Sequence, residues 1–262
     1  GLILIVLVGY AMTTGSFGAG LAYLFNPDWS KLDGKVLLAA LGHAFFTLSL
    51  GMGIMMAYGS YLGQEVNLLR AARTVVIMDT VFALCAGMAI FPIVFANGLD
   101  PAAGPGLVFV TLPLAFGHMG GGLVIGALFF LLLTFAALTS SISLLEPVVE
   151  LIEERTPLGR VAATLIAGIT IWALGIAALL SFNVWGDVKL FGMNIFDLLD
   201  YATSKFMLPL AGLGAIVFAA WKLDQQGVKA ELGLGDAGFG LWTLLSRYVA
   251  PVGVLFVFWS NL

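Results

Sequence analysis

Residues 42–61 read GHAFFTLSLGMGIMMAYGSY, a stretch long and apolar enough to cross a membrane yet interrupted in its middle. Ser49, Gly51 and Gly53 stand where a continuous spanning helix would have Leu, and Gly costs about 1 kcal/mol relative to Ala inside a helix. Non-helical backbone at membrane depth is tolerated only where it lines a cavity or is buried in protein. The stretch therefore predicts two half-helices that meet near the midplane, with unpaired backbone groups that suit small charged solutes and cations.

The composition indicates an all-α integral membrane protein that crosses the membrane several times. Hydrophobic residues make up 61% of the chain and charged residues 10%, whereas soluble proteins have about a quarter of their residues charged. The net charge of -4 includes no polybasic run, so nucleic acid is excluded as a partner. The single Cys85 allows neither an internal disulfide nor a cysteine metal cluster. Because Gly1 already lies in an apolar run with no signal-peptide features, we expect helices upstream of it.

Seven segments have the roughly 20 apolar residues of a spanning helix. They are residues 1–25, 36–57, 74–96, 119–145, 160–182, 197–221 and 240–260. The loops on one side hold Lys31, Lys35 and Lys189. The other side carries seven basic residues, namely Arg70, Arg73, Arg155, Arg160, Lys222, Lys229 and Arg247. By the positive-inside rule the second side faces the cytoplasm, so the first segment runs outward and the broken one inward.

We predict different structures for two of the stretches that connect these segments. Residues 97–118 are rich in Pro, but 107–114 are too apolar for a plain solvated loop, so we expect them to fold back into an outer vestibule. Residues 223–239 contain four Gly and few apolar residues, which is typical of a cytoplasmic linker.

Hydroxyl groups cluster at residues 136–143, AALTSSIS. Two interpretations stay open. The hydroxyls can bond to carbonyls one turn earlier, as Ser and Thr usually do in membrane helices. Alternatively, hydroxyl and carbonyl oxygens can bind sodium, a hard cation, without a buried charge that would hold the ion too tightly. Thr47, beside the break, is a second candidate of the same kind.

Carboxylates in apolar segments are further candidates. Asp79 is a functional residue by default, as a cation ligand or as the partner of an Arg at the interface. Asp197 and Asp200 begin the sixth segment, either as part of a gate or as a wetted helix start, and Asp200 lies deeper. Four Glu residues close the fourth segment, and we expect one or two to pair with basic residues: Glu146, Glu150, Glu153 and Glu154.

Motifs of catalysis are missing from the sequence. It contains no GxSxG, HExxH, Walker loop or CxxC, and His43 and His118 have no second ligand at metal spacing. The sequence therefore gives little support to an enzyme.

Four motifs together resemble the neurotransmitter:sodium symporter family, and in particular its bacterial carriers of hydrophobic amino acids. They are FFTLSLGMG at 45–53, IFP at 90–92, FAALTSSISLLEP at 135–147 and RYVAP at 247–251, in the family's order and spacing. The resemblance implies the C-terminal part of a five-plus-five inverted-repeat sodium symporter fold with a broken helix six. Residues 1–35 would form the outer part of helix five and the extracellular loop after it. Residues 36–221 would form the second inverted repeat, helices six to ten, and residues 222–262 a cytoplasmic linker and helix eleven.

Site residues follow from the resemblance, position by position. Two sodium ions are expected, one at Thr47 and Asp79 and one at the Ala136 carbonyl with the Thr139 and Ser140 hydroxyls. The substrate's ammonium would meet the carbonyls of Phe46 and Thr47 and the hydroxyl of Ser49. The side-chain pocket would be lined by Phe46, Met52, Ser140 and Leu144. Asp200 would form an outer gate, and Tyr61 and Glu154 an inner one, each with an Arg of the family's N-terminal helices, which this sequence lacks.

Two departures from the family pattern refine these expectations. Asp79 stands where chloride-dependent relatives have Asn, and Ala83 stands one turn later where another bacterial relative has Glu. We expect Asp79 to supply the negative charge that chloride would otherwise bring. Met52 stands where the leucine-transporting relative has Phe, and adaptable Met predicts a pocket that also accepts bulky or aromatic amino acids.

The expected function is sodium-coupled symport of a hydrophobic L-amino acid into the cell by alternating access, in the plasma membrane. The partners are the lipid bilayer, the substrate and the N-terminal helices of the same full-length protein. Two alternatives remain open at this point. One is a channel-like or receptor-like sodium-dependent protein without tight coupling, and the other is an inactive structural fragment.

Overall fold

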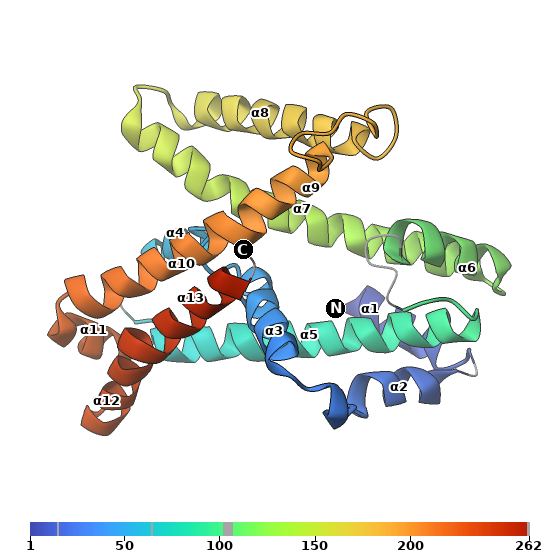
Figure 1. Cartoon of the computed structure of the whole chain (residues 1–262), viewed down its shortest axis with the longest axis horizontal. Helices are drawn as coiled ribbons and strands as arrows, with labels where there is room; N and C mark the ends of the chain where they lie inside the picture. Colours follow the sequence, from blue (N-terminus) through green and yellow to red (C-terminus); the bar gives the residue numbers. More distant parts are fainter. Residues whose placement is uncertain (15, 64, 102–106, 261–262) are drawn as a thin grey trace. The chain divides into compact units, whose positions relative to one another are not determined.

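The computed structural model describes residues 1–14, 16–63, 65–101 and 107–260, and within these ranges the chain is helical (Figure 1). The described part has one isolated β-bridge, between Leu190 and Met193. The chain divides into two compact units. Unit 1 consists of residues 1–32 and 74–140, and unit 2 of residues 33–73 and 141–262.

Unit 1 is built from short helices around parts of two long ones. Its elements are α1 (Leu2–Ala11), α2 (Phe17–Phe25), a 3-10 turn (Trp29–Lys31), most of α5 (Leu68–Ala96), a π-helical turn (Leu107–Thr111), α6 (Leu112–His118) and the first part of α7 (Gly122–Arg155). Apolar side chains from α1, α5, α6 and α7 form its buried core: Leu4, Leu7, Ala11, Ala89, Ile93, Val94, Leu112, Ala115, Phe116, Ile125 and Phe129.

Helix α2 packs against α5 through aromatic rings and a close backbone approach. The Tyr23 ring lies 4.7 Å from the Phe91 ring and 5.5 Å from the Phe95 ring, measured between centroids. A Cβ atom on Gly20 would lie 2.6 Å from the Pro92 ring. A larger residue at position 20 would therefore separate the two helices.

Helices α6 and α7 also approach each other closely. A Cβ atom on Gly122 would lie 1.8 Å from the carbonyl oxygen of Phe116, and one on Gly126 would lie 3.1 Å from the Phe116 ring. Leu112 is fully buried. The prediction that the apolar end of residues 97–118 is not a plain solvated loop is confirmed for residues 107–118, and residues 102–106 lie outside the described ranges.

Unit 2 contains the helices that follow the first unit's loop and the C-terminal half of the chain. They are α3 (Gly34–Thr47), α4 (Ile54–Ser60), α8 (Arg160–Leu180), α9 (Ile195–Asp200), α10 (Leu208–Val217), α11 (Gln225–Leu232), α12 (Asp236–Leu244) and α13 (Ala250–Ser260), with the start of α5 and the end of α7. Three π-helical turns, Tyr201–Met207, Phe218–Lys222 and Leu245–Val249, interrupt these helices. Helices α10 and α13 lie side by side, and α3 contacts both (Figure 1).

Five stretches of the described chain are long and apolar enough to cross a membrane. They are Leu68–Ala96, Gly122–Arg155, Arg160–Leu180, Ile195–Lys222 and Asp236–Phe256. These agree with five of the seven segments expected from the sequence, and residues 36–57 are broken as predicted. The chain is therefore an all-helical, multi-pass membrane protein.

Two expectations about individual segments are wrong. Residues 1–25 do not form one spanning helix, because α1 ends at Ala11, where the hydroxyls of Thr13 and Thr14 donate to the carbonyls of Tyr10 and Ala11. Residues 223–239 are largely helical rather than a plain linker. Asp224 caps α11, because its carboxylate accepts hydrogen bonds from the backbone N–H groups of Gln226 and Gly227. The glycines of this segment made the helix hard to predict from the sequence.

Candidate functional site

The broken helix is present in the structure at the predicted place. Helix α3 ends at Thr47 and α4 begins at Ile54. Between them the backbone adopts φ values of 54° at Ser49, 79° at Gly51 and 80° at Gly53. Positive φ values are incompatible with a right-handed helix and are readily adopted by Gly. The sequence pattern that predicted the break is thus the pattern that permits it.

Close packing explains why glycine is needed in the break. A Cβ atom on Gly51 would lie 2.6 Å from the carbonyl oxygen of Leu208 and 2.9 Å from the backbone nitrogen of Gly212, both on α10. Gly212 in turn leaves room for the Phe45 ring, since its own Cβ would lie 2.7 Å from that ring. At Gly51 the non-helical backbone therefore packs closely against protein, as membrane-embedded breaks require.

Two backbone N–H groups in the break donate hydrogen bonds to carbonyls at the end of α3. The N–H of Ser49 donates to the Phe46 carbonyl at 3.1 Å, and the N–H of Leu50 donates to the Phe45 carbonyl at 2.9 Å. A carbonyl oxygen has two lone pairs, so the Phe46 oxygen retains one for a further donor. The oxygen that we expect to meet a substrate ammonium is held in place by this bond.

Four of the six expected substrate residues lie together along this break: Phe46, Thr47, Ser49 and Met52. The Phe46 side chain is exposed, and those of Ser49 and Met52 are half-buried. Leu144, also in unit 2, is exposed on α7. Ser140 belongs to unit 1 and is described with it below.

The hydroxyl cluster on α7 includes a helix-internal hydrogen bond of the kind that the first interpretation expects, and the sodium interpretation stays a prediction. The Thr139 hydroxyl lies 3.0 Å from both the Phe135 and the Ala136 carbonyl oxygens, to which it donates. A hydroxyl that coordinates a cation must direct its proton elsewhere, and a hydrogen bond to a helix carbonyl is one way to do so. Ala136, Thr139 and Ser140 fall within about one turn of the same helix, which places three potential oxygen ligands in one short stretch.

Asp79 lies within α5 and is half-buried in unit 1. Within that unit, its carboxylate makes no hydrogen bond or ion pair with the residues that the structure describes. Thr47, its expected partner at a sodium ion, belongs to unit 2. The described ranges contain no group of three or more His, Cys, Asp and Glu residues that could hold a metal ion. A cation site in this part of the chain would therefore have to use hydroxyl and carbonyl oxygens as well.

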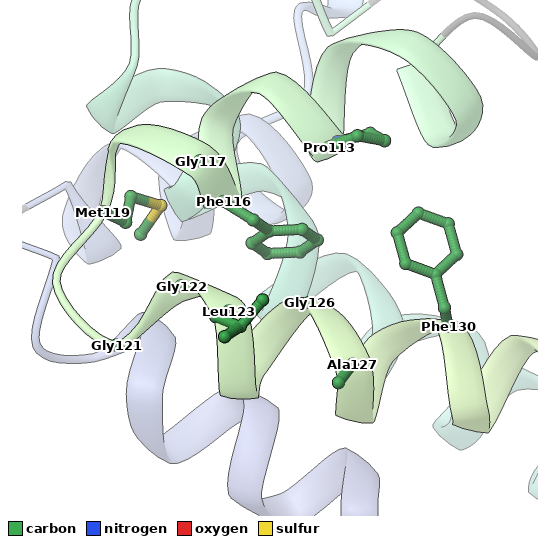
Figure 2. Close-up of a pocket in the computed structure, with 10 residues that line it drawn as sticks. All are labelled: Pro113, Phe116, Gly117, Met119, Gly121, Gly122, Leu123, Gly126, Ala127 and Phe130. Atoms are coloured by element: carbon green, nitrogen blue, oxygen red, sulfur yellow. The ribbon is translucent and has the colours of Figure 1, made fainter.

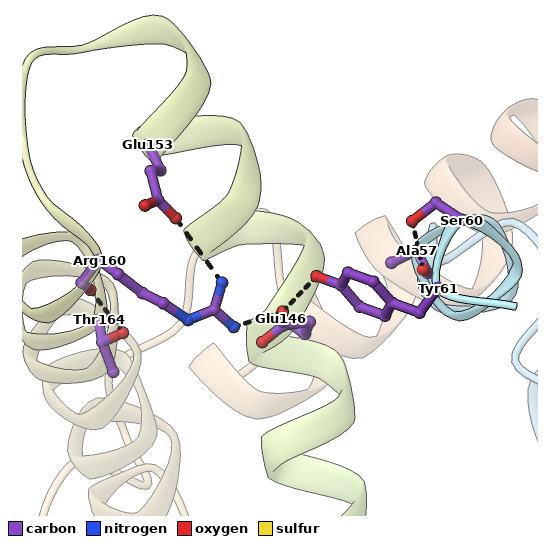
Figure 3. A network of polar contacts seen from close by, with 7 residues as sticks. All are labelled: Ala57, Ser60, Tyr61, Glu146, Glu153, Arg160 and Thr164. Carbon is purple, nitrogen blue, oxygen red and sulfur yellow. Dashed lines mark hydrogen bonds and ion pairs between the residues drawn. The ribbon is translucent and has the colours of Figure 1, made fainter. Parts of the chain in front are cut away.

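A polar network joins α4, α7 and α8 in unit 2 (Figure 3). The Tyr61 hydroxyl donates to Oε1 of Glu146 at 2.8 Å, and Nη2 of Arg160 donates to the same oxygen at 2.5 Å. Nη1 of Arg160 lies 3.6 Å from Oε2 of Glu153. The bond from the tyrosine to the Glu146 carboxylate raises the pKa of Tyr61 above its ordinary value.

The inner-gate assignment of Tyr61 and Glu154, each with an Arg of the family's N-terminal helices, stays a prediction. The structure pairs Tyr61 with Glu146, whereas Glu154 is exposed and has no partner among the described residues. The prediction that one or two of the four Glu residues pair with a basic residue is confirmed by Glu146 and Glu153, which both contact Arg160.

A second contact of this kind was not expected from the sequence. The Tyr58 hydroxyl and the Ser143 hydroxyl lie 2.5 Å apart. Tyr58 and Tyr61 are three residues apart, and so are their partners Ser143 and Glu146. Residues three apart lie on one helix face, so this matched spacing is the signal that could have identified the pairing of α4 with α7.

The expected outer-gate residue, Asp200, is exposed at the end of α9. Its carboxylate accepts a hydrogen bond of 2.9 Å from the Ser204 hydroxyl, and a π-helical turn begins at the next residue, Tyr201. Such turns are frequent at functional sites, because they displace side chains from the regular helical positions.

An apolar pocket of about 600 Å³ lies between α6 and the start of α7, within unit 1 (Figure 2). The Phe116 and Phe130 rings face its interior, and it contains none of the expected substrate or sodium residues. Its lining is Pro113, Phe116, Gly117, Met119, Gly121, Gly122, Leu123, Gly126, Ala127 and Phe130.

Comparison with known proteins gives a consistent result across sequence and structure. Residues 2–262 match the model of the sodium:neurotransmitter symporter family. The chain is 36% identical to an uncharacterised sodium-dependent transporter of Haemophilus influenzae, over 93% of this chain and 54% of that protein. It is 35% identical to the uncharacterised sodium-dependent transporter YhdH of Bacillus subtilis, over 98% of this chain and 58% of that protein.

A solved structure is also similar along the whole chain. It is the crystal structure of MhsT in complex with L-phenylalanine, which superposes with a TM-score of 0.89 at 45% sequence identity. The match covers 100% of this chain and 60% of the MhsT chain. The chain thus spans little more than half the length of the relatives it matches.

Proposed function

The chain belongs to the sodium:neurotransmitter symporter family, and we propose that it is part of a transporter that carries a hydrophobic L-amino acid into the cell together with sodium. The family is one of transporters rather than enzymes. Uptake would proceed by alternating access across the plasma membrane, with the remaining helices of the full-length protein completing the sites.

The broken helix is the observation that carries this proposal. Its positive φ values at Ser49, Gly51 and Gly53 leave the carbonyls of Phe46 and Thr47 at the end of one half-helix. Carbonyl oxygens at the C-terminal end of a helix carry partial negative charge, which favours an ammonium group or a cation. The proposal assigns the substrate ammonium to these carbonyls and to the Ser49 hydroxyl.

Sodium would be bound by neutral oxygens and one carboxylate. The first ion is assigned to Thr47 and Asp79, and the second to Ala136, Thr139 and Ser140. The spacing of Ala136, Thr139 and Ser140 supports the second assignment, because it places three oxygen ligands within about one turn of α7. Each positive charge that moves inward gains about 2.3 kcal/mol per 100 mV of membrane potential, which is enough to drive uphill accumulation of the substrate.

Substrate selectivity would depend on Phe46, Met52, Ser140 and Leu144. MhsT is described in complex with L-phenylalanine, an aromatic amino acid. An unbranched Met side chain adapts to different shapes, so we expect the pocket to accept aromatic residues as well as Leu. Asp200 would act at the outer gate, and Tyr61 and Glu154 at the inner one.

Uptake into proteoliposomes that contain the natural full-length protein tests this function. An inward sodium gradient should drive accumulation of radiolabelled L-leucine or L-phenylalanine above the external concentration, and replacing sodium with choline should abolish it. Replacing chloride with gluconate should leave uptake intact, because Asp79 supplies the negative charge. Unlabelled Trp and Tyr should compete with labelled Leu.

The same assay separates the alternatives. Sodium current without uphill accumulation would identify a channel-like or receptor-like protein and contradict symport. Residues 1–262 expressed alone should bind no substrate, because this chain carries only part of each site.

A further inference from the structure

The connection between α8 and α9 ends in a tight hairpin. The N–H of Leu190 donates to the Met193 carbonyl at 2.8 Å, and the N–H of Met193 donates to the Leu190 carbonyl at 3.1 Å. The two residues between them, Phe191 and Gly192, have φ values of 54° and 81°. Two positive φ values in a two-residue loop are the signature of a type I′ turn.

The base of this connection is fixed to both helices. Ser181 is buried, donates its hydroxyl to the Ala178 carbonyl at 2.6 Å, and accepts the N–H of Phe196 at 3.3 Å. The Phe182 and Phe196 rings lie 4.9 Å apart between centroids. The hairpin is thus held in a defined position at the ends of α8 and α9.

Phe191 is an unusual residue for the turn that it occupies. Asn-Gly forms the same turn without strain, whereas a bulky side chain at positive φ is strained. The Phe191 side chain is also 92% exposed, so no contact within the described chain compensates for the strain. Val184 at 78% exposure, with Trp185 and Leu190, extends the apolar surface around it.

The position of the hairpin along the chain identifies what covers this surface. Helix α8 has 21 residues and is therefore about 31 Å long, close to the hydrocarbon thickness of a bilayer of about 30 Å. The residues after Leu180 consequently lie at the membrane–water interface, and the chain re-enters a spanning segment at Ile195. Amphipathic and aromatic side chains are favoured at this depth, where apolar groups reach lipid and polar groups reach water.

We propose that the hairpin of residues 190–193 is an interfacial membrane anchor that inserts Phe191 into the outer leaflet of the lipid bilayer. Exposed Lys189, the neighbour of Leu190, lies where its ammonium can meet lipid phosphate. Helix α8 and the following span are long and apolar enough to cross a membrane, so the anchor would continue the lipid contact of those spans. Such an anchor fixes the depth of the α8–α9 end relative to the membrane.

Site-specific fluorescence quenching tests the anchor in the full-length protein reconstituted in phosphatidylcholine vesicles. In a background with Cys85→Ala and any other cysteine replaced, Phe191→Cys is labelled with the environment-sensitive dye NBD. The control is Asp187→Cys, an exposed position in the same connection. Quenching is measured with doxyl-labelled phosphatidylcholine in the bilayer and with iodide in the water.

The anchor predicts strong lipid quenching at position 191 and iodide quenching several-fold weaker than at position 187. Iodide quenching equal to that at 187 would overturn the proposal, since the tip would then stand in water. Protection from both quenchers would also overturn it, because the tip would then be covered by protein. If the Phe191→Cys protein does not fold, Leu190→Cys is read in the same way.

Discussion

Replacing Gly51 with Ala tests whether close packing on α10 holds the helix break. The new Cβ atom would lie 2.6 Å from the carbonyl oxygen of Leu208 and 2.9 Å from the backbone nitrogen of Gly212. Both are backbone atoms inside or beside a helix, so neither can move without shifting that helix. The backbone at position 51, with φ of 79°, is in addition strained for any residue with a side chain.

The two effects can be estimated separately. A left-handed conformation costs an L-residue about 1–2 kcal/mol, and overpacking of a close-packed site costs about 1–3 kcal/mol. Gly51→Ala should therefore destabilise the protein by about 2–5 kcal/mol. Gly53→Ala has the same strain at φ of 80°, but its Cβ would meet Pro147 at an ordinary 3.4 Å. It should show the strain alone, about 1–2 kcal/mol.

Thermal unfolding of the purified full-length protein in detergent measures these differences. Gly59→Ala is the matched control, because it lies in α4 and its Cβ would have nothing within 4 Å. It should be neutral or slightly stabilising, since Ala is the better helix former. The expected order of Tm is Gly59→Ala highest, then Gly53→Ala, then Gly51→Ala. A Gly51→Ala protein as stable as Gly53→Ala would refute the packing argument.

Substitutions at three further positions test the proposed ion sites and the inner network. Thr139→Val should abolish sodium-driven uptake while Thr139→Ser retains it, because only the hydroxyl oxygen can bind the ion; equal uptake by both would remove this residue from the site. Asp79→Asn should make uptake depend on chloride, measured by gluconate replacement, and continued chloride independence would contradict the charge argument. Tyr61→Phe should increase labelling of a cysteine introduced at the cytoplasmic end of α4, because it removes the donor to Glu146. Because the folded pKa of Tyr61 is raised, this bond should persist below pH of about 10 and be lost as the pH rises through that higher pKa. The difference in labelling between wild type and Tyr61→Phe should therefore be present below pH of about 10 and disappear at higher pH.

The break itself was predictable from sequence because its cause is local. Ser49, Gly51 and Gly53 interrupt an apolar run, and the positive φ values at these three residues are the direct consequence of that composition. The five spans of the described chain were predictable for the same reason, since length and hydropathy decide them.

The interruption of the helix within residues 1–25 was harder to predict from the sequence. All the apolar residues needed for one helix are present, but two adjacent hydroxyls, of Thr13 and Thr14, bond back to the final turn of α1. Hydropathy does not register this competition between side chain and backbone. The same is true of α11, where a capping Asp224 outweighs the surrounding glycines.

The partner of Tyr61 required the three-dimensional structure. The rotation of α4 about its own axis depends on the dihedral angles of the break, and these decide which carboxylate on α7 its tyrosines meet. Along α7, Glu150 lies about one helical turn after Glu146, and Glu154 lies one turn further. The sequence supplies several carboxylates of similar chemistry, so only the observed geometry selects Glu146.

The two halves of the broken helix are held by different parts of unit 2, which gives the break a mechanical role. The end of α3 is fixed to α10 through Phe45 and Gly212, and α3 also contacts α13. Helix α4 is tied to α7 by two hydrogen bonds, one between the hydroxyls of Tyr58 and Ser143 and one from Tyr61, at the C-cap of α4, to Glu146. A change of angle between the halves requires no bond within either helix to break, because the N–H groups of Ser49 and Leu50 already depart from the regular helical pattern. The proposed substrate site at the carbonyls of α3 would lie at the pivot of such a movement. Arg160, which shares Glu146 with Tyr61, joins α8 to the C-terminal end of α4. This arrangement supports alternating access, in which occupancy at the break alters the contacts at the cytoplasmic end.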